Sequence, residues 1–328
     1  MVLDTSRRVL SSRRICMPTD FFLTIADIPV ALEWSPPISR VKTPPAYRPF
    51  LSSGRAGTRL RLSTATQHLD DGIKAFESPP IWSLYRSPSG LSFHIYDAYP
   101  DLRRTLFIPP AGRDARLDFS GSDWDPFAGP AMELLLITVL ADCEGVVLHG
   151  CGIDAGGRGI VFAGESGAGK TTLSRLWFEE EGGEILSDDR VIVRRQDGGF
   201  RLYGTPWHGE ACFAAPGGVP LERIYFIRHG RRNHASNMSA AGVVRELLKC
   251  SFPPFWDASG MRAALEFFDA LAGAVPCEEL SFTPERAVID FVLSSALRRA
   301  ALPYRQQGVG EAFSLDDRGW KAAPTSGT

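Results

Sequence analysis

The sequence has no excess of positive charge. Its 328 residues include 36 Lys and Arg against 38 Asp and Glu, and the formal net charge is -2. Proteins that bind polynucleotides hold the phosphate backbone largely with basic side chains. We therefore expect no nucleic-acid partner, and small-molecule or protein substrates instead.

The sequence also lacks paired cysteine motifs. It has six cysteines, but no Cys-x-x-Cys pair and no histidine at zinc-ligand spacing. They are Cys16, Cys143, Cys151, Cys212, Cys250 and Cys277. This scatter argues against a disulfide framework and a structural zinc site, and it indicates reduced thiols in a cytoplasmic protein.

Long apolar runs are missing as well. The longest, such as residues 134–140, are far too short to span a bilayer, so we expect no membrane partner. The first residues are rich in Arg and Ser and lack the apolar core of a secretory signal. We expect residues 1–16 to be a disordered leader, with a transit peptide or a true start at Met17 as alternatives.

The length exceeds one typical domain, and two regions differ in pattern. Residues 17–125 alternate short β-like runs with Ser, Pro and Gly, which predicts a small, mainly β N-terminal domain. In FFLTIADIPVALEW we expect two strands around a turn at Ala26 and Asp27. The boundary is GSDWDPFAGP, and a buried helix, AMELLLITVLAD, follows with Pro130 in its first turn.

Residues 130–300 predict an α/β domain, followed by a flexible tail at 301–328. GVVLHGCGI and GIVFA are expected strands joined by a tight turn, and TTLSRLWFEEE is an expected helix. Further strands are expected at EILS, RVIVRR, FRLY and LERIYFIRH. Residues 240–300 should be mostly helical, interrupted by PCEELSF.

The decisive motif runs from Gly164 to Thr171. Its sequence, GESGAGKT, fits G-x-x-x-x-G-K-[ST], and an expected strand enters it while an expected helix leaves it. The glycines allow backbone N–H groups to converge on phosphate oxygens, Lys170 supplies a charge, and the Thr171 hydroxyl can ligate Mg²⁺. We expect ATP and Mg²⁺ as ligands, contacted by this loop. The expected contact residues are Gly164, Glu165, Ser166, Gly167, Ala168, Gly169, Lys170, Thr171 and Thr172.

Two carboxylates follow the next strand. Asp188 and Asp189 can hold Mg²⁺ and accept a proton from an attacking hydroxyl, and two adjacent carboxylates near a triphosphate are costly without such a role. An ordinary solvated acidic turn is the alternative. His149 lies on the strand paired to the one that enters the loop, where it could donate to phosphate or be a satisfied core residue.

Two further segments leave their roles open. In GTPWHGE, Thr205, His208 and Glu210 could line a site and Trp207 could cap a base or a substrate, or the segment could be a packed turn. No Asn-Lys-x-Asp guanine reader is present, which favours ATP over GTP. The two asparagines, Asn233 and Asn237, are expected in a loop.

The segments LHGCGIDAGGRGIVFAGESGAGKTTL and GGEILSDDRVIV resemble the kinase domain of HPr kinase/phosphorylase and its HPr-kinase-like relatives. The resemblance covers about residues 145–195 and continues more loosely to VPCEELSFTPERAVIDFV. It implies a P-loop kinase core of HPr kinase/phosphoenolpyruvate carboxykinase type with a mixed sheet. It also implies in-line transfer of the γ-phosphate to a serine hydroxyl.

The same resemblance implies particular roles. Lys170 and Thr171 would hold Mg-ATP, Asp189 would be the acid/base aspartate with the metal-binding Asp188 beside it, and His149 matches a histidine of the family. The chain departs from HPr kinase in lacking the later E-x-R-G segment, for which Glu210 is only a positional stand-in. HPr is therefore not the expected acceptor, and looser relatives phosphorylate free serine or a peptide serine.

We therefore expect an ATP-dependent kinase whose partner is a hydroxyl-bearing acceptor, namely serine, a peptide or a protein. A homo-oligomer is compatible with the sequence. A nucleotide-responsive binding module without turnover is the alternative, although a pure sensor needs no Asp pair. A carboxykinase-like reaction is disfavoured, because no cluster of His and Lys supplies its metal site.

Overall fold

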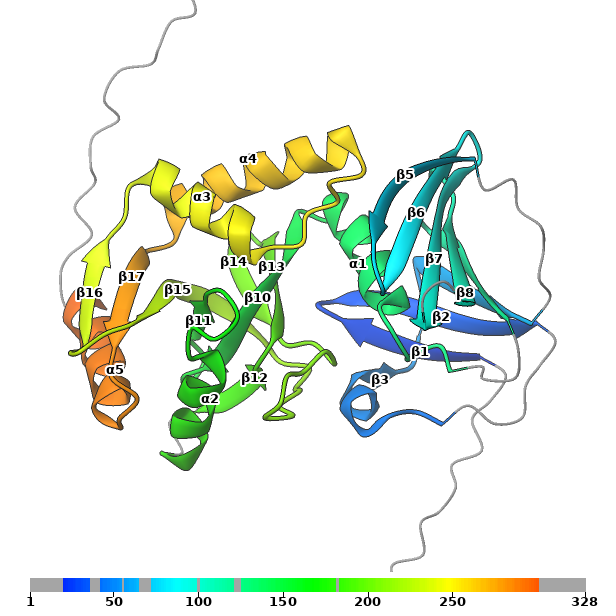
Figure 1. The fold of residues 1–328 in the computed structure, drawn as a ribbon. Helices are drawn as coiled ribbons and strands as arrows, with labels where there is room; N and C mark the ends of the chain where they lie inside the picture. The colour runs from blue at the N-terminus through cyan, green and yellow to red at the C-terminus, as the bar shows by residue number, and fades with distance from the viewer. Residues whose placement is uncertain are drawn as a thin grey trace, which may run out of the picture. The chain divides into compact units, whose positions relative to one another are not determined.

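The computed structural model describes residues 20–35, 42–54, 56–64, 72–98, 101–120, 125–180 and 183–300 (Figure 1). The predictions for residues 1–16 and 301–328 lie outside these ranges. One compact unit extends to Ile289 and contains both the β-rich and the α/β region. A second unit begins at Asp290, inside helix α5 (Ala287–Ala300), and its described part is helical.

The N-terminal region is a single β-sheet. Among the described residues, nine strands pair in the order β3-β1-β2-β4-β9-β8-β7-β6-β5. The strands are β1 (Asp20–Ile25), β2 (Ile28–Ser35), β3 (Leu51–Ser52), β4 (Thr58–Ser63), β5 (Ile73–Ser78), β6 (Trp82–Ser87), β7 (Gly90–Ala98), β8 (Asp101–Ile108) and β9 (Asp114–Phe119), with a 3-10 helix at Pro45–Phe50. The predicted β-rich region is confirmed.

The first hairpin follows directly from its turn residues. Ala26 and Asp27 both have positive φ, 51° and 58°, as a two-residue hairpin turn of type I′ requires. Ile25 pairs with Ile28 across this turn, so the predicted pair of strands is confirmed.

Helix α1 (Ala131–Ala141) joins the two regions. Pro130 is its N-cap, and its buried residues lie on all sides of the helix, so α1 is a core helix, as the sequence predicts. Its leucines belong to one apolar core that also includes Leu60 and Phe93 of the first sheet and Ile192 and Tyr203 of the second.

The second sheet is mixed, as the resemblance implies. Its described strands pair in the order β11-β10-β13-β14-β15-β17-β16, while β12 pairs with β10 and β15 pairs with β11 as well as β14. Strands β10, β11, β13, β14 and β15 therefore close into a ring. The strands are β10 (Gly145–Asp154), β11 (Gly159–Ala163), β12 (Glu184–Ser187), β13 (Arg190–Gln196), β14 (Gly199–Tyr203), β15 (Gly218–His229), β16 (His234–Asn237) and β17 (Cys277–Phe282).

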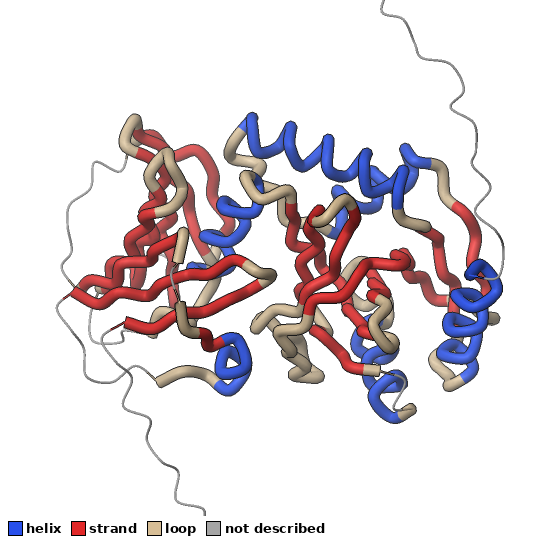
Figure 2. The backbone as a smooth tube through the Cα atoms, turned by 180° about the vertical axis from the view of Figure 1, so that it is seen from behind, coloured by secondary structure: helices blue, strands red, loops and turns tan. Residues whose placement is uncertain are grey.

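Three helices complete this region of the first unit. They are α2 (Lys170–Glu179), α3 (Ala240–Cys250) and α4 (Ala258–Ala274). Helices α3 and α4 lie together over one end of the ring of strands (Figure 2), and their Leu247 and Phe268 belong to the same apolar cluster as Leu148 and Val161. The mostly helical stretch after residue 240, interrupted by β17, is as predicted.

One assignment from the sequence was wrong. Asn237 is the last residue of β16, which pairs antiparallel with β17, and it is not a loop residue. HASN is too short and too polar to show the pattern of a strand, and β16 forms because β17 offers it backbone partners.

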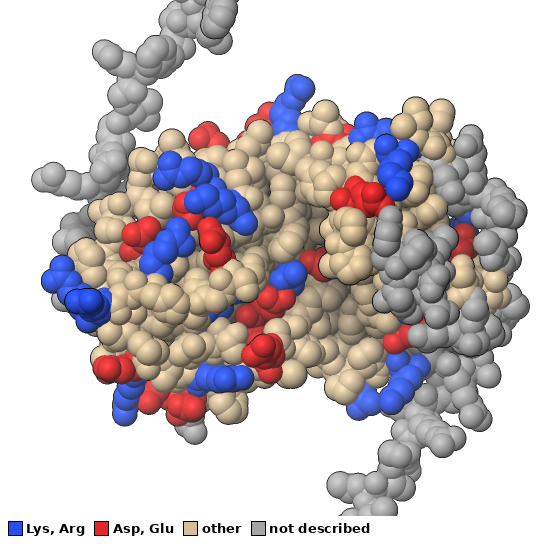
Figure 3. Space-filling view, in the orientation of Figure 1, with Lys and Arg blue, Asp and Glu red and all other residues tan. Residues whose placement is uncertain are grey.

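The surface of the described residues fits the charge balance of the sequence. Lys and Arg side chains are interspersed with Asp and Glu on the face drawn in Figure 3, without one continuous basic field. No helix in the described part of the chain is long and apolar enough to cross a membrane.

Candidate active site

The glycine-rich loop, Gly164–Thr171, links strand β11 to helix α2. All five residues of β11 are buried, and α2 begins at Lys170, so the predicted strand, loop and helix are confirmed. Gly167 and Gly169 have φ of 81° and 104°, which L-residues rarely adopt. A Cβ at Gly169 would lie 2.7 Å from the Phe282 ring, whereas a Cβ at Gly167 would meet open space.

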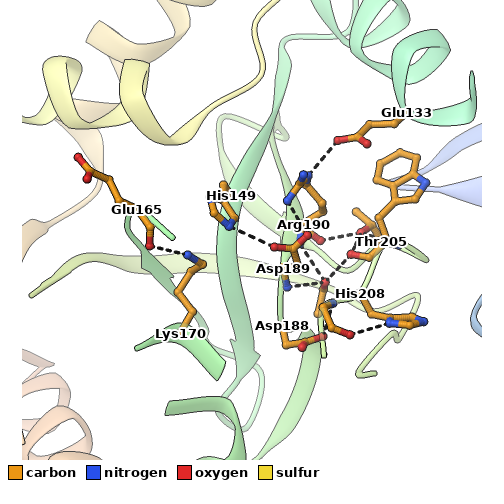
Figure 4. A network of polar contacts seen from close by, with 12 residues as sticks. Glu133, His149, Glu165, Lys170, Asp188, Asp189, Arg190, Thr205 and His208 are labelled. Carbon is orange, nitrogen blue, oxygen red and sulfur yellow. Dashed lines mark hydrogen bonds and ion pairs between the residues drawn. The ribbon is translucent and has the colours of Figure 1, made fainter. Parts of the chain in front are cut away.

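Lys170 folds back over this loop. Its Nζ donates to the carbonyl oxygens of Gly164 and Glu165, at 2.9 Å each, and the residue is 7% exposed (Figure 4). Burial lowers the pKa of Lys170, although the negative charge of Asp189 acts in the opposite direction. The ammonium group is thus held at the centre of the loop, with two of its three donors used.

Asp189 and His149 meet beside the loop. Gly150 of β10 pairs with Ala163 of β11, so His149 lies at the level where the glycine-rich loop begins. The Nε2 atom of His149 is 3.1 Å from Oδ1 of Asp189, and the two side chains are 25% and 29% exposed. The backbone is fixed as well, because Gly150 N donates to the carbonyl of Asp189 at 3.0 Å.

Arg190 and Glu133 extend this pair into a network that the sequence did not predict. Arg190 donates from its terminal nitrogen to Oδ2 of Asp189 at 2.5 Å and from Nε to Glu133 of α1 at 3.0 Å. Its guanidinium lies 4.4 Å from the centre of the Phe252 ring. Burial raises the pKa of Glu133, and the charge of Arg190 opposes that shift.

The network determines the charge state of Asp189. Burial alone would raise the pKa of Asp189, but the hydrogen bond from His149 and the positive charges of Arg190 and Lys170 outweigh it and lower the pKa below the usual range. Asp189 is therefore ionised at neutral pH. A carboxylate has about four lone-pair sites, and only two accept the bonds described here.

Asp188 is in a different environment from Asp189. It is 2% exposed, and its oxygens accept backbone N–H bonds from Gly209 and Ala211, at 2.9 Å each, and from Phe213 at 3.3 Å. These bonds use the carboxylate to hold the loop that follows β14. Its predicted role as a metal ligand stays a prediction.

The GTPWHGE segment lies next to the Asp pair, because a Cβ added at Gly209 would come within 3.3 Å of the Asp189 Cβ. Thr205 is fully buried and donates to the carbonyl of Arg190 at 2.6 Å, so it fixes the loop and does not line a cavity. Trp207 donates from its indole nitrogen to the hydroxyl of Tyr47 at 2.9 Å. His208 and Glu210 are exposed on the same loop.

The residues present fit a magnesium nucleotide. The loop offers backbone N–H groups around Gly167, where added atoms meet open space, together with the ammonium of Lys170 and the hydroxyl of Thr171. Within the described ranges no group of three or more His, Cys, Asp or Glu side chains could hold a metal ion alone. Mg²⁺ does not need one, since it is commonly held by one or two protein ligands plus phosphate oxygens.

The comparisons with known proteins assign no family. No protein-family model matches the chain, and no curated protein matches it. The geometry of the site and the glycine-rich motif are therefore the features from which its function is inferred.

Proposed function

We propose that the chain is an ATP-dependent phosphotransferase with a P-loop kinase core of HPr-kinase-like type. It transfers the γ-phosphate of ATP to a serine-type hydroxyl on a small molecule, a peptide or a protein. One observation carries the proposal: the glycine-rich loop with Lys170 and the ionised, partly exposed carboxylate of Asp189 converge beside β10. The sequence resemblance to HPr-kinase-like proteins supports the same reaction.

The loop residues bind and orient the nucleotide. The N–H groups of residues 164–170 and the positive end of α2 face the phosphates, and Lys170 exchanges its bonds to loop carbonyls for bonds to phosphate oxygens. Thr171 would hold Mg²⁺, which would supply neutralisation of the charge on the β- and γ-phosphates. These contacts stabilise charge that develops in the transition state.

Asp189 moves the proton. The acceptor hydroxyl donates its proton to the Asp189 carboxylate as its oxygen forms a bond to the γ-phosphorus, and the bond from that phosphorus to the β,γ-bridging oxygen breaks. ADP is the leaving group. His149 and Arg190 hold the carboxylate in place, each through one oxygen, and leave lone pairs for the acceptor.

The acceptor approaches along the loop that Asp188 holds. This loop contains Trp207, whose indole is bonded to Tyr47 of the N-terminal region. The N-terminal region therefore contributes to the wall on the acceptor side, where it can select among hydroxyl-bearing substrates. The buried carboxylate of Asp188 already fixes this loop, so the loop can position the acceptor without changing its own conformation.

A transfer assay tests the proposal. Wild-type protein and the Lys170→Ala variant are incubated with γ-labelled ATP and Mg²⁺, with free L-serine in one reaction and a peptide and protein extract in another. We expect label to move to serine or to one peptide or protein, and to be lost with Lys170→Ala. ATP binding that depends on Lys170 but is never followed by transfer would instead support a nucleotide-responsive binding module.

A further inference from the structure

The glycine-rich loop has two flanks in the sheet, and the proposed reaction uses only one of them. On that flank β10 contains His149 and pairs with β12, after which Asp189 follows. On the other flank, β15 runs parallel to β11 and β17 runs parallel to β15. Parallel strands bring their carboxyl ends to one edge of a sheet, and the glycine-rich loop leaves β11 at this edge.

The segments that follow β15 and β17 touch the glycine-rich loop directly. His229, the last residue of β15, has its Nε2 atom 2.7 Å from the carbonyl oxygen of Gly167. Phe282, the last residue of β17, lies against Gly169, where an added Cβ would come within 2.7 Å of its ring. Gly230 N donates to the carbonyl of Phe282 at 3.0 Å, which ties the two segments together.

Asn233 stands at this edge with its amide orientation fixed. Its Oδ1 accepts from the backbone N–H of Thr283 at 3.0 Å and lies 3.4 Å from the Thr283 hydroxyl. Because the oxygen takes these bonds, the Nδ2 group is the donor that Asn233 can offer to a ligand. Arg231 and Arg232, two residues and one residue before it, are exposed.

A nucleoside triphosphate has a reacting end and a nucleoside end, and the phosphate chain that the glycine-rich loop would hold separates them. The proposed function puts the γ-phosphate beside Asp189, and the present inference rests on that assignment. We propose that the segments after β15 and β17 bind the adenine nucleoside of ATP. His229 and Phe282 border the triphosphate, and Asn233 Nδ2 donates to an acceptor nitrogen of the base or to a ribose oxygen.

The chemistry of the neighbouring side chains suits this ligand. A guanidinium stacks on a flat aromatic base and tolerates the adjacent α-phosphate, as Arg231 or Arg232 would do from this exposed segment. The Asn233 side chain is already ordered by the bonds to its oxygen, so a ligand that accepts from its Nδ2 group loses little binding energy to ordering it. The absence of an Asn-Lys-x-Asp guanine-binding motif from the sequence is compatible with an adenine site of this kind.

The test compares ATP with inorganic tripolyphosphate, which has the phosphates but no nucleoside. Asn233→Asp keeps an acceptor oxygen for Thr283 and removes the donor. Asn233→Ser removes the same donor without adding a charge. The matched control is Asn237→Asp, the same change on β16 opposite Glu278, away from the carboxyl end of β17. Affinities are measured by calorimetry with Mg²⁺ at about 0.15 M salt, where exposed charges are screened beyond about 8 Å.

We expect both Asn233 variants to weaken ATP binding by about 10-fold, the loss of roughly one hydrogen bond. Binding of tripolyphosphate should change by less than about 2-fold, as should both affinities of Asn237→Asp. If the Asn233 variants weakened the binding of ATP and of tripolyphosphate equally, or left ATP binding unchanged, the nucleoside assignment would be overturned. A wild-type protein that binds neither ligand would overturn the proposed function itself. ATP binding that depends on Asn233, in a protein that transfers no phosphate, would support the nucleoside site and contradict the kinase alone.

Discussion

At the scale of single residues, two adjacent aspartates have different environments. Asp188 is buried and accepts bonds from three backbone N–H groups, whereas Asp189 is partly exposed and is paired with the side chains of His149 and Arg190. From the sequence alone the two aspartates can be recognised only as an adjacent acidic pair. In the structure Asp188 anchors the loop that follows β14, whereas Asp189 is the partly exposed carboxylate to which we assign the proton transfer.

The positive charge of Arg190 helps to lower the pKa of Asp189, so both stability and activity should depend on pH. The folded-state pKa of Asp189 lies below its unfolded value, so its contribution to stability is present above about pH 4 and is lost as the pH falls through the folded pKa. Replacing Arg190 with Gln removes one of the charges that lower this pKa.

We therefore expect Arg190→Gln to shift the acidic limb of kcat/KM to higher pH. The pH profile of phosphate transfer, followed from the lowest pH at which the protein stays folded up to pH 8, checks this. Arg195→Gln is the matched control, because Arg195 is on the same strand, is half exposed and pairs only loosely with Glu144 at 3.8 Å. An acidic limb that coincides in wild type and Arg190→Gln would show that Arg190 does not set the charge of Asp189.

At the scale of elements, the junction of β11 and α2 depends on Gly169. Its left-handed φ of 104° and the Phe282 ring 2.7 Å from an added Cβ both oppose a side chain. Gly198, in the hairpin between β13 and β14, has φ of 77° but nothing within 4 Å of an added Cβ. Both glycines therefore need a left-handed backbone, but only at Gly169 would an added Cβ clash with a neighbouring side chain.

We expect Gly169→Ala to weaken ATP binding by at least about 10-fold, because the loop must shift away from Phe282. Gly198→Ala should cost about 1 kcal/mol of stability, from the left-handed backbone alone, and leave ATP binding unchanged. Thermal unfolding and calorimetric titration of both variants measure this difference. Equal ATP affinity in Gly169→Ala and wild type would mean that the contact with Phe282 does not shape the loop.

The elements also show what could be predicted from the sequence. The strand, loop and helix around Lys170 follow from a local motif whose glycines and flanking patterns lie within a few residues of one another. Arg190 and Glu133 could not be paired in this way, since they are 57 positions apart and their contact depends on how α1 packs on the sheet. The same holds for Trp207 and Tyr47, which are 160 positions apart.

At the scale of the whole molecule, the β-rich region and the α/β region share one core. Arg194 donates to the carbonyl of Ala26 at 2.6 Å, and Tyr203 donates to Asp27 at 2.7 Å. Burial raises the pKa of Tyr203 to about 12, so its hydroxyl stays a donor at neutral pH. The sequence predicted a boundary near residues 125–130, and that boundary stays a prediction, but contacts across it are extensive.

We expect the first unit to unfold in a single transition by calorimetry. Arg194→Ala, which removes a buried donor from the carbonyl of Ala26, should lower the stability by about 1–3 kcal/mol without splitting the transition. Arg195→Ala, its exposed neighbour, should change stability by less than about 0.5 kcal/mol. Two separate transitions in the wild-type protein would contradict the shared core.

The proton transfer to Asp189 is tested most directly with the Asp189→Asn variant, assayed for ATP affinity and for phosphate transfer in parallel. The carboxylate is lost while the residues that contact the nucleotide are kept. We predict ATP affinity within about 2-fold of wild type and transfer reduced by about 100-fold or more, as expected for the loss of a general base. Asp188→Asn, one residue earlier, should instead lower the thermal midpoint, because its backbone N–H partners lose an acceptor. Transfer at the wild-type rate by Asp189→Asn would show that this carboxylate does not take the proton.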